Sequence, residues 1–125
     1  MFHVVTPIRN GEKFITPCLR SLLQQTRDDW RCTIIDDCSD DNTANIVAEF
    51  CKTDSRFTLL TNTERIYAVG NYFKVLHEHQ RPEDIVVCLD GDDRFSDGGV
   101  LARVAKAYAD PAVWITWGSF WHVIN

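Results

Sequence analysis

Short apolar stretches alternate with longer amphipathic stretches along the whole chain, and this alternation restricts the fold more than any other feature of the sequence. The stretches with the length and β-branched content of strands are residues 2–6, 30–35, 57–60, 85–89 and 112–117. The stretches with apolar residues at helical spacing are residues 12–25, a segment capped within residues 39–43, and residues 66–79 and 98–109. Strands and helices in alternation predict right-handed βαβ units around a mostly parallel sheet with helices on both faces. We therefore expect an α/β fold.

Two of these stretches carry more specific expectations. Residues 85–89 are apolar without interruption, which predicts a strand buried on both faces. In residues 66–79 the apolar side chains repeat at helical spacing and mark one face of a helix, formed by Ile66, Val69, Phe73 and Leu76.

Length, composition and charge exclude several classes of protein. The chain has 125 residues, which corresponds to one domain over residues 1–125, and its composition is ordinary for a globular protein. The formal net charge is −5 and no block of basic residues occurs, so we expect no nucleic-acid partner and no anionic membrane surface as a partner. No apolar run approaches the roughly 20 residues of a membrane span.

The cysteines favour a reducing compartment. They number five, and none has the spacing of zinc ligands. Free thiols in a reducing environment are the simplest interpretation. We therefore expect a cytoplasmic protein.

Acidic residues follow two of the predicted strands. Asp36 and Asp37 come after residues 30–35, and Asp90, Asp92 and Asp93 come after residues 85–89. Because parallel strands end at the same edge of a sheet, we expect these five carboxylates to meet there, with raised pKa values unless a cation is present. Manganese or magnesium suits carboxylates together with phosphate oxygens. The alternative for residues 90–93 is a solvated Asp-Gly turn.

Four segments resemble, in order, the motifs of family 2 glycosyltransferases with the GT-A fold. The segments are residues 4–12 (VVTPIRNGE), 21–26 (SLLQQT), 34–43 (IIDDCSDDNT) and 89–93 (LDGDD), and the last is similar to the DxD element of that family. The resemblance covers essentially the whole chain. It implies a GT-A, Rossmann-like domain that binds a nucleotide-diphospho-sugar.

The resemblance also implies how the donor is held. In the family, the first loop and the second Asp of the DD pair contact the nucleobase, commonly uridine, and these roles would belong to Pro7, Arg9 and Asp37. Arg65 matches a basic residue that some members use near the base and phosphates. The carboxylate of Asp37 would accept the N–H of the base in a charge-assisted hydrogen bond.

The DxD element would hold the ribose and the metal. The resemblance assigns the ribose contact to Asp92 and metal ligation chiefly to Asp93, with Asp92 beside it, while Asp90 is the alternative first Asp of the motif. A divalent cation, manganese or magnesium, would bridge the diphosphate and stabilise the leaving group.

Two positions depart from the family pattern. Arg9 stands where the family usually has an aromatic residue, so a cation–π or phosphate contact would replace stacking on the base. Cys38 stands where the DD turn usually has glycine, and cysteine adopts a positive φ less readily.

The function that the resemblance implies is transfer of a sugar, commonly UDP-linked in this family, to an acceptor hydroxyl. The resemblance implies a longer catalytic domain with its general base in a later half, so we expect the acceptor half to be absent from residues 1–125, and no catalytic residue is identified here. Trp117, Phe120 and Trp121 would then lack a covering layer, which predicts a homo-oligomer or a partner chain at the aromatic C-terminal segment.

Two other functions fit parts of the sequence. A non-catalytic module that binds nucleotide sugars would use the same residues without turnover. A receiver-like signalling domain also has about five strands, but it needs a phospho-acceptor Asp after the third strand, where this chain has Thr61 and Asn62.

Overall fold

The computed structural model describes residues 1–119. Strands and helices alternate along the chain, as the sequence predicts. In order they are β1 (Phe2–Ile8), α1 (Ile15–Leu23), β2 (Trp30–Asp36), α2 (Thr43–Thr53), β3 (Phe57–Thr61), α3 (Tyr67–Glu78), β4 (Ile85–Cys88) and α4 (Val100–Ala107). None of the helices among these residues is long and apolar enough to cross a membrane.

The strands form one parallel sheet in the order β3-β2-β1-β4. The order reverses at β1, because the chain first moves outward through β2 and β3 and then returns to the other side of β1. This is the order of the Rossmann type, whereas flavodoxin-like sheets such as receiver domains have the order 2-1-3-4-5. The receiver-like alternative is therefore wrong.

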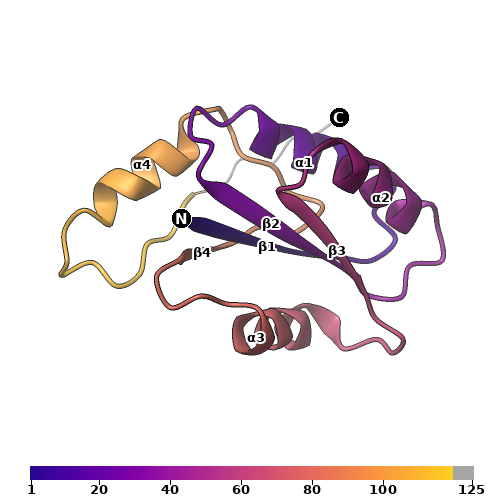
Figure 1. The fold of residues 1–125 in the computed structure, drawn as a ribbon. Helices are drawn as coiled ribbons and strands as arrows, with labels where there is room; N and C mark the ends of the chain where they lie inside the picture. Colours follow the sequence, from indigo (N-terminus) through magenta and orange to yellow (C-terminus); the bar gives the residue numbers. More distant parts are fainter. Residues whose placement is uncertain (120–125) are drawn as a thin grey trace.

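Helices cover both faces of the sheet, as predicted (Figure 1). Alternate residues of β1 point to opposite faces. Val4 packs in a core cluster with side chains of α1, α2 and α4, and Val5 packs in a second cluster with Val75 of α3. The larger cluster includes Trp30, whose ring centroid lies 5.4 Å from that of Phe57.

β1 continues two residues further than predicted, through Pro7. The carbonyl of Pro7 accepts a hydrogen bond from Gly91 at 3.1 Å, so this residue faces the β4 side of the strand. The ladder between β1 and β4 ends earlier, at Val5 and Cys88. Proline therefore removes no ladder hydrogen bond at this position, and the strand tolerates it.

Two expectations about the later elements are wrong, and a third element shows its apolar face to solvent. Residues 112–117 form no strand, and Trp114, Ile115 and Trp117 are 87%, 75% and 87% exposed. Within residues 1–119, β4 pairs only with β1, so it is an edge strand and only half-buried rather than buried on both faces. The apolar face of residues 66–79 points away from the sheet: Val69 and Phe73 are 82% and 69% exposed.

Candidate functional site

The loops that follow β1 and β4 meet against the side chain of Ile8. A Cβ at Gly91 would lie 2.6 Å from Cδ1 of Ile8, and a Cβ at Gly11 would lie 2.2 Å from the same atom. Only glycine allows this approach from both loops. Because the strand order reverses between β1 and β4, the two loops border the crevice in which open α/β sheets bind ligands.

Three carboxylates meet in the loop after β4. Asp90, Asp92 and Asp93 are exposed, and one oxygen from each lies within 4.8 Å of the others. The backbone N–H of Asp93 donates to the carbonyl of Asp90 at 2.9 Å, which closes the turn. Carboxylate oxygens are the ligands that Mg²⁺ and Mn²⁺ prefer, and a cation would offset the repulsion among three negative charges. These residues fit the divalent ion that the sequence predicts.

Asp36 and Asp37 do not join this cluster, so the prediction of five converging carboxylates is wrong. Asp36 is the last residue of β2 and is 2% exposed; within the described part of the chain its Oδ1 atom is buried without a hydrogen-bond partner. Asp36 shares the face of Ile34, which packs in the larger core cluster, since side chains alternate along a strand. Because of this position on β2, the carboxylate of Asp36 points into the protein interior and not toward the edge of the sheet where the strands end.

Asp37 is buried beneath the start of α3. Its Oδ1 accepts hydrogen bonds from Nδ2 of Asn62 (2.8 Å) and from the backbone N–H of Ile66 (3.0 Å), and its Oδ2 accepts from the N–H of Tyr67 (2.8 Å). Burial alone would raise the pKa of Asp37, but these hydrogen bonds hold it below its usual value. The expected rise in pKa is therefore wrong for Asp37, and the residue is an ionised carboxylate that orders the N-terminus of α3.

Hydrogen bonds join the loops after β1 and β2. The guanidinium of Arg9 lies 3.3 Å from the carboxylate of Asp40, and Oδ1 of Asn10 accepts from the N–H of Asp40 at 2.8 Å. Asn10 has a φ of 50° and Cys38 has a φ of 62°. Cys38 thus adopts the conformation for which glycine is the usual residue, and its thiol donates to the carbonyl of Asn62 at 3.3 Å.

Arg65 lies at the entry to α3. Its guanidinium carbon is 4.1 Å from the ring centroid of Tyr67, whose own N–H contacts Asp37. Arg65 and Asp37 are therefore connected through a single residue. A cavity of about 430 Å³ lies beside this segment and is lined by Thr61, Asn62, Thr63, Glu64, Ile66 and Lys74.

Sequence reasoning missed the polar side chains of α3 that face the sheet. The hydroxyl of Tyr72 donates to Oδ1 of Asp90 at 2.7 Å, and Oδ1 of Asn71 accepts from Asn62 at 2.7 Å. Burial and the Asp90 carboxylate raise the pKa of Tyr72, so its phenol stays protonated. The sequence does contain a second set of residues at helical spacing, Asn71, Tyr72 and Val75. It was overlooked because the stripe of Ile66, Val69, Phe73 and Leu76 is more apolar.

The sequence model of "Glycosyl transferase family 2" matches residues 3–124. The chain belongs to glycosyltransferase family 2. Its four-stranded parallel sheet also matches solved GT-A glycosyltransferases. The fold implied by the four sequence motifs is confirmed.

Three relatives illustrate this family 2 similarity. The mannosyltransferase PcManGT of Pyrobaculum calidifontis, solved with GDP-Man and Mn²⁺, is 29% identical with a TM-score of 0.80 over 90% of this chain and 33% of that chain. TarS 1–349 of S. aureus, solved with UDP, is 26% identical with a TM-score of 0.75 over 88% of this chain and 32% of that chain. The UDP-Glc:alpha-D-GlcNAc-diphosphoundecaprenol beta-1,3-glucosyltransferase WfgD of Escherichia coli is 42% identical over 70 residues, which are 56% of this chain and 26% of the relative. The family 2 chain described here spans about a third of the length of these relatives, or less.

Proposed function

We propose that this chain binds the donor of a metal-dependent glycosyltransferase, a UDP-sugar whose sugar passes to an acceptor hydroxyl. The observation that carries the proposal is the meeting of three exposed carboxylates, within 4.8 Å of one another, in a loop of a family 2 domain. That loop lies at the reversal of strand order, where open α/β sheets bind their ligands.

Asp92 and Asp93 would hold Mn²⁺ or Mg²⁺. The bound ion would supply Lewis-acid stabilisation of the charge that grows on the departing diphosphate. Asp92 would also contact the ribose, and Asp90 would complete the acidic side of the site. The Mn²⁺ in the structure of PcManGT, to which this chain is similar, supports a cation at this position.

Asp37 retains the capacity to bind a nucleobase. A carboxylate offers about four acceptor positions, and Asn62, Ile66 and Tyr67 occupy three of them. Among the described residues, the side chain of Asn71 also stabilises the ionised form of Asp37 by hydrogen bonding. An N–H of a base would bind at Oδ2, beside the hydrogen bond from Tyr67. Pro7 and Arg9 would border the base from the loop after β1, and Arg65 would approach from the start of α3.

The proposal is tested by titrating the chain with UDP and with GDP in a calorimeter, with and without Mn²⁺. We expect UDP to bind in the presence of Mn²⁺, and we expect Asp92→Asn and Asp93→Asn to weaken that binding. Asp28→Asn is the matched control, because Asp28 is exposed and precedes β2 at the opposite end of the sheet.

The outcomes separate the alternatives. Equal binding by all four proteins would contradict the site assignment, and preference for GDP would contradict the uridine donor. UDP-sugar binding without turnover, against every acceptor tried, would support the non-catalytic module instead.

A further inference from the structure

A hydrogen bond connects α3 to the loop after β4 that carries Asp90, Asp92 and Asp93, which is called the acidic loop below. Tyr72 donates its hydroxyl to Oδ1 of Asp90 at 2.7 Å, across 18 positions of sequence. We propose that Tyr72 is a positioning residue that fixes the Asp90 carboxylate for the cation and donor. This inference rests on the proposed function of the acidic loop and adds to it a residue from a different element.

The ring of Tyr72 is held in place by apolar contacts. It packs against the core cluster of Val5, Ile35 and Val75, on the face of the sheet that α3 covers. The side chain is half-buried, and only its hydroxyl needs to reach the exposed loop. A phenol fixed in this way offers its proton at a defined point, at little cost in side-chain entropy.

The contact restricts a carboxylate that would otherwise be free to rotate. Asp90, Asp92 and Asp93 are exposed and carry like charges within 4.8 Å, so repulsion favours their separation. The hydroxyl of Tyr72 retains Oδ1 of Asp90 by a hydrogen bond to a charged acceptor, which is stronger than one between neutral groups. Oδ2 of Asp90 then remains for a cation or a ribose hydroxyl.

The residue before Tyr72 contacts the other end of the proposed site. Nδ2 of Asn62 donates both to Oδ1 of Asn71 and to Oδ1 of Asp37. Neighbouring residues of one helix therefore reach the predicted base-binding carboxylate and the predicted metal-binding loop. α3 therefore sets the distance between Asp37 and the acidic loop, and Tyr72 is the residue of α3 that contacts the acidic loop.

The first measurement is metal affinity. Tyr72→Phe removes the hydroxyl and keeps the ring, so the apolar packing is retained. We expect it to weaken Mn²⁺ binding, followed by the electron paramagnetic resonance signal of free Mn²⁺, and Mn²⁺-dependent UDP binding by about tenfold, as is usual for partners of metal ligands. Tyr108→Phe is the matched control, because Tyr108 is also half-buried but its hydroxyl faces the carbonyl of Trp114 on α4's side of the fold.

The second measurement separates positioning from general stability. In an Asp90→Ala background, Tyr72→Phe should cause no further loss of affinity, because its only proposed target is gone. The ¹³Cζ resonance of Tyr72 should shift on Asp90→Ala and stay unchanged on Asp28→Asn. A full additional loss in the Asp90→Ala background would overturn the inference.

These results also distinguish this inference from the proposed function. If the wild type binds Mn²⁺ and UDP and Tyr72→Phe binds them equally well, Tyr72 has no positioning role and the function stands. If the wild type binds neither, the proposed function fails, and the positioning role fails with it even where the ¹³Cζ shift shows the hydrogen bond.

Discussion

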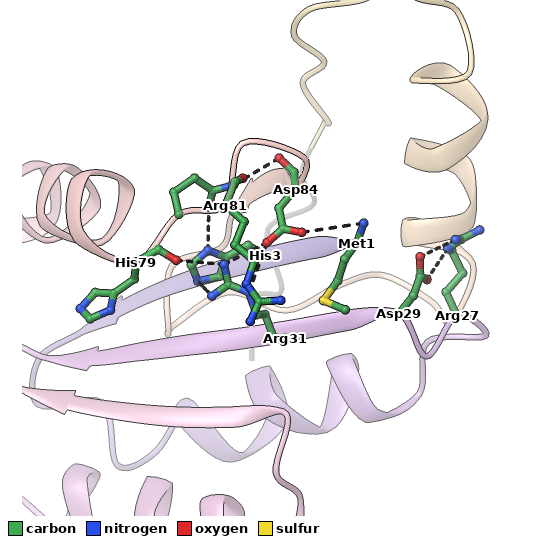
Figure 2. Close-up of polar contacts among 9 residues, drawn as sticks. Met1, His3, Arg27, Asp29, Arg31, His79, Arg81 and Asp84 are labelled. Carbon is green, nitrogen blue, oxygen red and sulfur yellow. Dashed lines mark hydrogen bonds and ion pairs between the residues drawn. The ribbon is translucent and has the colours of Figure 1, made fainter.

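Arg31 forms an ion pair with Asp84 at 2.9 Å (Figure 2). The pair lies where β2 and β4 begin, at the end of the sheet opposite the acidic loop. The side chain of Asp84 is 1% exposed, and the same guanidinium contacts Nε2 of His3 at 3.1 Å. His3 is fully buried; its Nδ1 lies 2.7 Å from Oε1 of Gln80 and its Nε2 lies 2.8 Å from Oγ1 of Thr33. The group joins β1 and β2 to the segment between α3 and β4.

The ring of His3 is neutral in this arrangement. Oε1 of Gln80 only accepts, so Nδ1 carries the proton, and Nε2 accepts from Arg31. A proton on Nε2 as well would face the guanidinium of Arg31, which can donate hydrogen bonds but cannot accept them. Burial, outweighing the hydrogen bond to Gln80 and reinforced by Arg31, lowers the pKa of His3 from its ordinary value of 6.5.

Stability should therefore fall with acid below about pH 6.5. The unfolded chain binds a proton at His3 at a higher pH than the folded chain does, so lowering the pH through this window favours unfolding. Urea unfolding at pH 7.5 and 5.5 measures the effect. His3→Gln should reduce the difference, whereas His77→Gln should not, because His77 is exposed on α3; an unchanged pH dependence in His3→Gln would contradict the assignment.

Replacement of Asp37 should destabilise the fold. Asp37→Asn turns one acceptor oxygen into an NH₂ group that faces backbone N–H donors at the start of α3. We expect a loss of about 1–3 kcal/mol in the free energy of unfolding, the usual cost of an unsatisfied buried polar group. Urea denaturation measures it, with Asp40→Asn as the control because the Asp40 side chain is 82% exposed; equal stabilities would show that Asp37 does not order α3.

Gly91→Ala should displace the acidic loop. The added Cβ would lie 2.7 Å from Cβ of Ile8, so either the loop or β1 must move, and such overpacking costs about 1–3 kcal/mol. Thermal unfolding and Mn²⁺ titration should both report the change. Ile8→Ala should partly restore metal binding in the Gly91→Ala protein by making room.

The control for that change is Gly118→Ala, since no atom of residues 1–119 lies within 4 Å of a Cβ at Gly118. It should leave both measurements unchanged. Unaltered Mn²⁺ affinity in Gly91→Ala would mean that the loop adjusts without loss of its ligand arrangement.

The aromatic C-terminal segment should support association. Trp114 and Trp117 are each 87% exposed, while Phe120 and Trp121 lie outside the described residues. We expect a homo-oligomer or a complex with a partner chain, and sedimentation at micromolar concentration should detect self-association that Trp114→Ser with Trp117→Ser reduces. Phe73→Ser is the control, because Phe73 is 69% exposed on α3; dissociation by that variant alone would place the interface on α3 instead.

Sequence periodicity predicted the order of strands and helices and placed the acidic loop after β4. It marked the apolar stripe of α3 but not the face that packs on the sheet, because a helical repeat shows that a face exists and not which side of the helix the sheet covers. The hydrogen bonds of Asn71 and Tyr72 select the less apolar face, and they depend on Asn62 and Asp90, which lie far away in the sequence. Residues 112–117 have strand-like composition, but a strand also needs a neighbour to pair with, and composition does not reveal whether one is present.

For the candidate site, too, the sequence predicted local features but not those that depend on distant contacts. Motif spacing selected Asp90, Asp92 and Asp93, and the structure brings their carboxylates close together in one turn. It did not separate them from Asp36 and Asp37, because the direction of each carboxylate depends on the end of β2 and on the start of α3.

The contact of Ile8 with Gly11 and Gly91 has a consequence for redesign. The side chain of Ile8 separates the loop that carries Arg9 from the acidic loop. Shortening or lengthening that side chain would tune the gap between the two loops while every charged group keeps its identity. We therefore expect substitutions of Ile8, which is itself buried, to alter ligand preference through the spacing of the two loops.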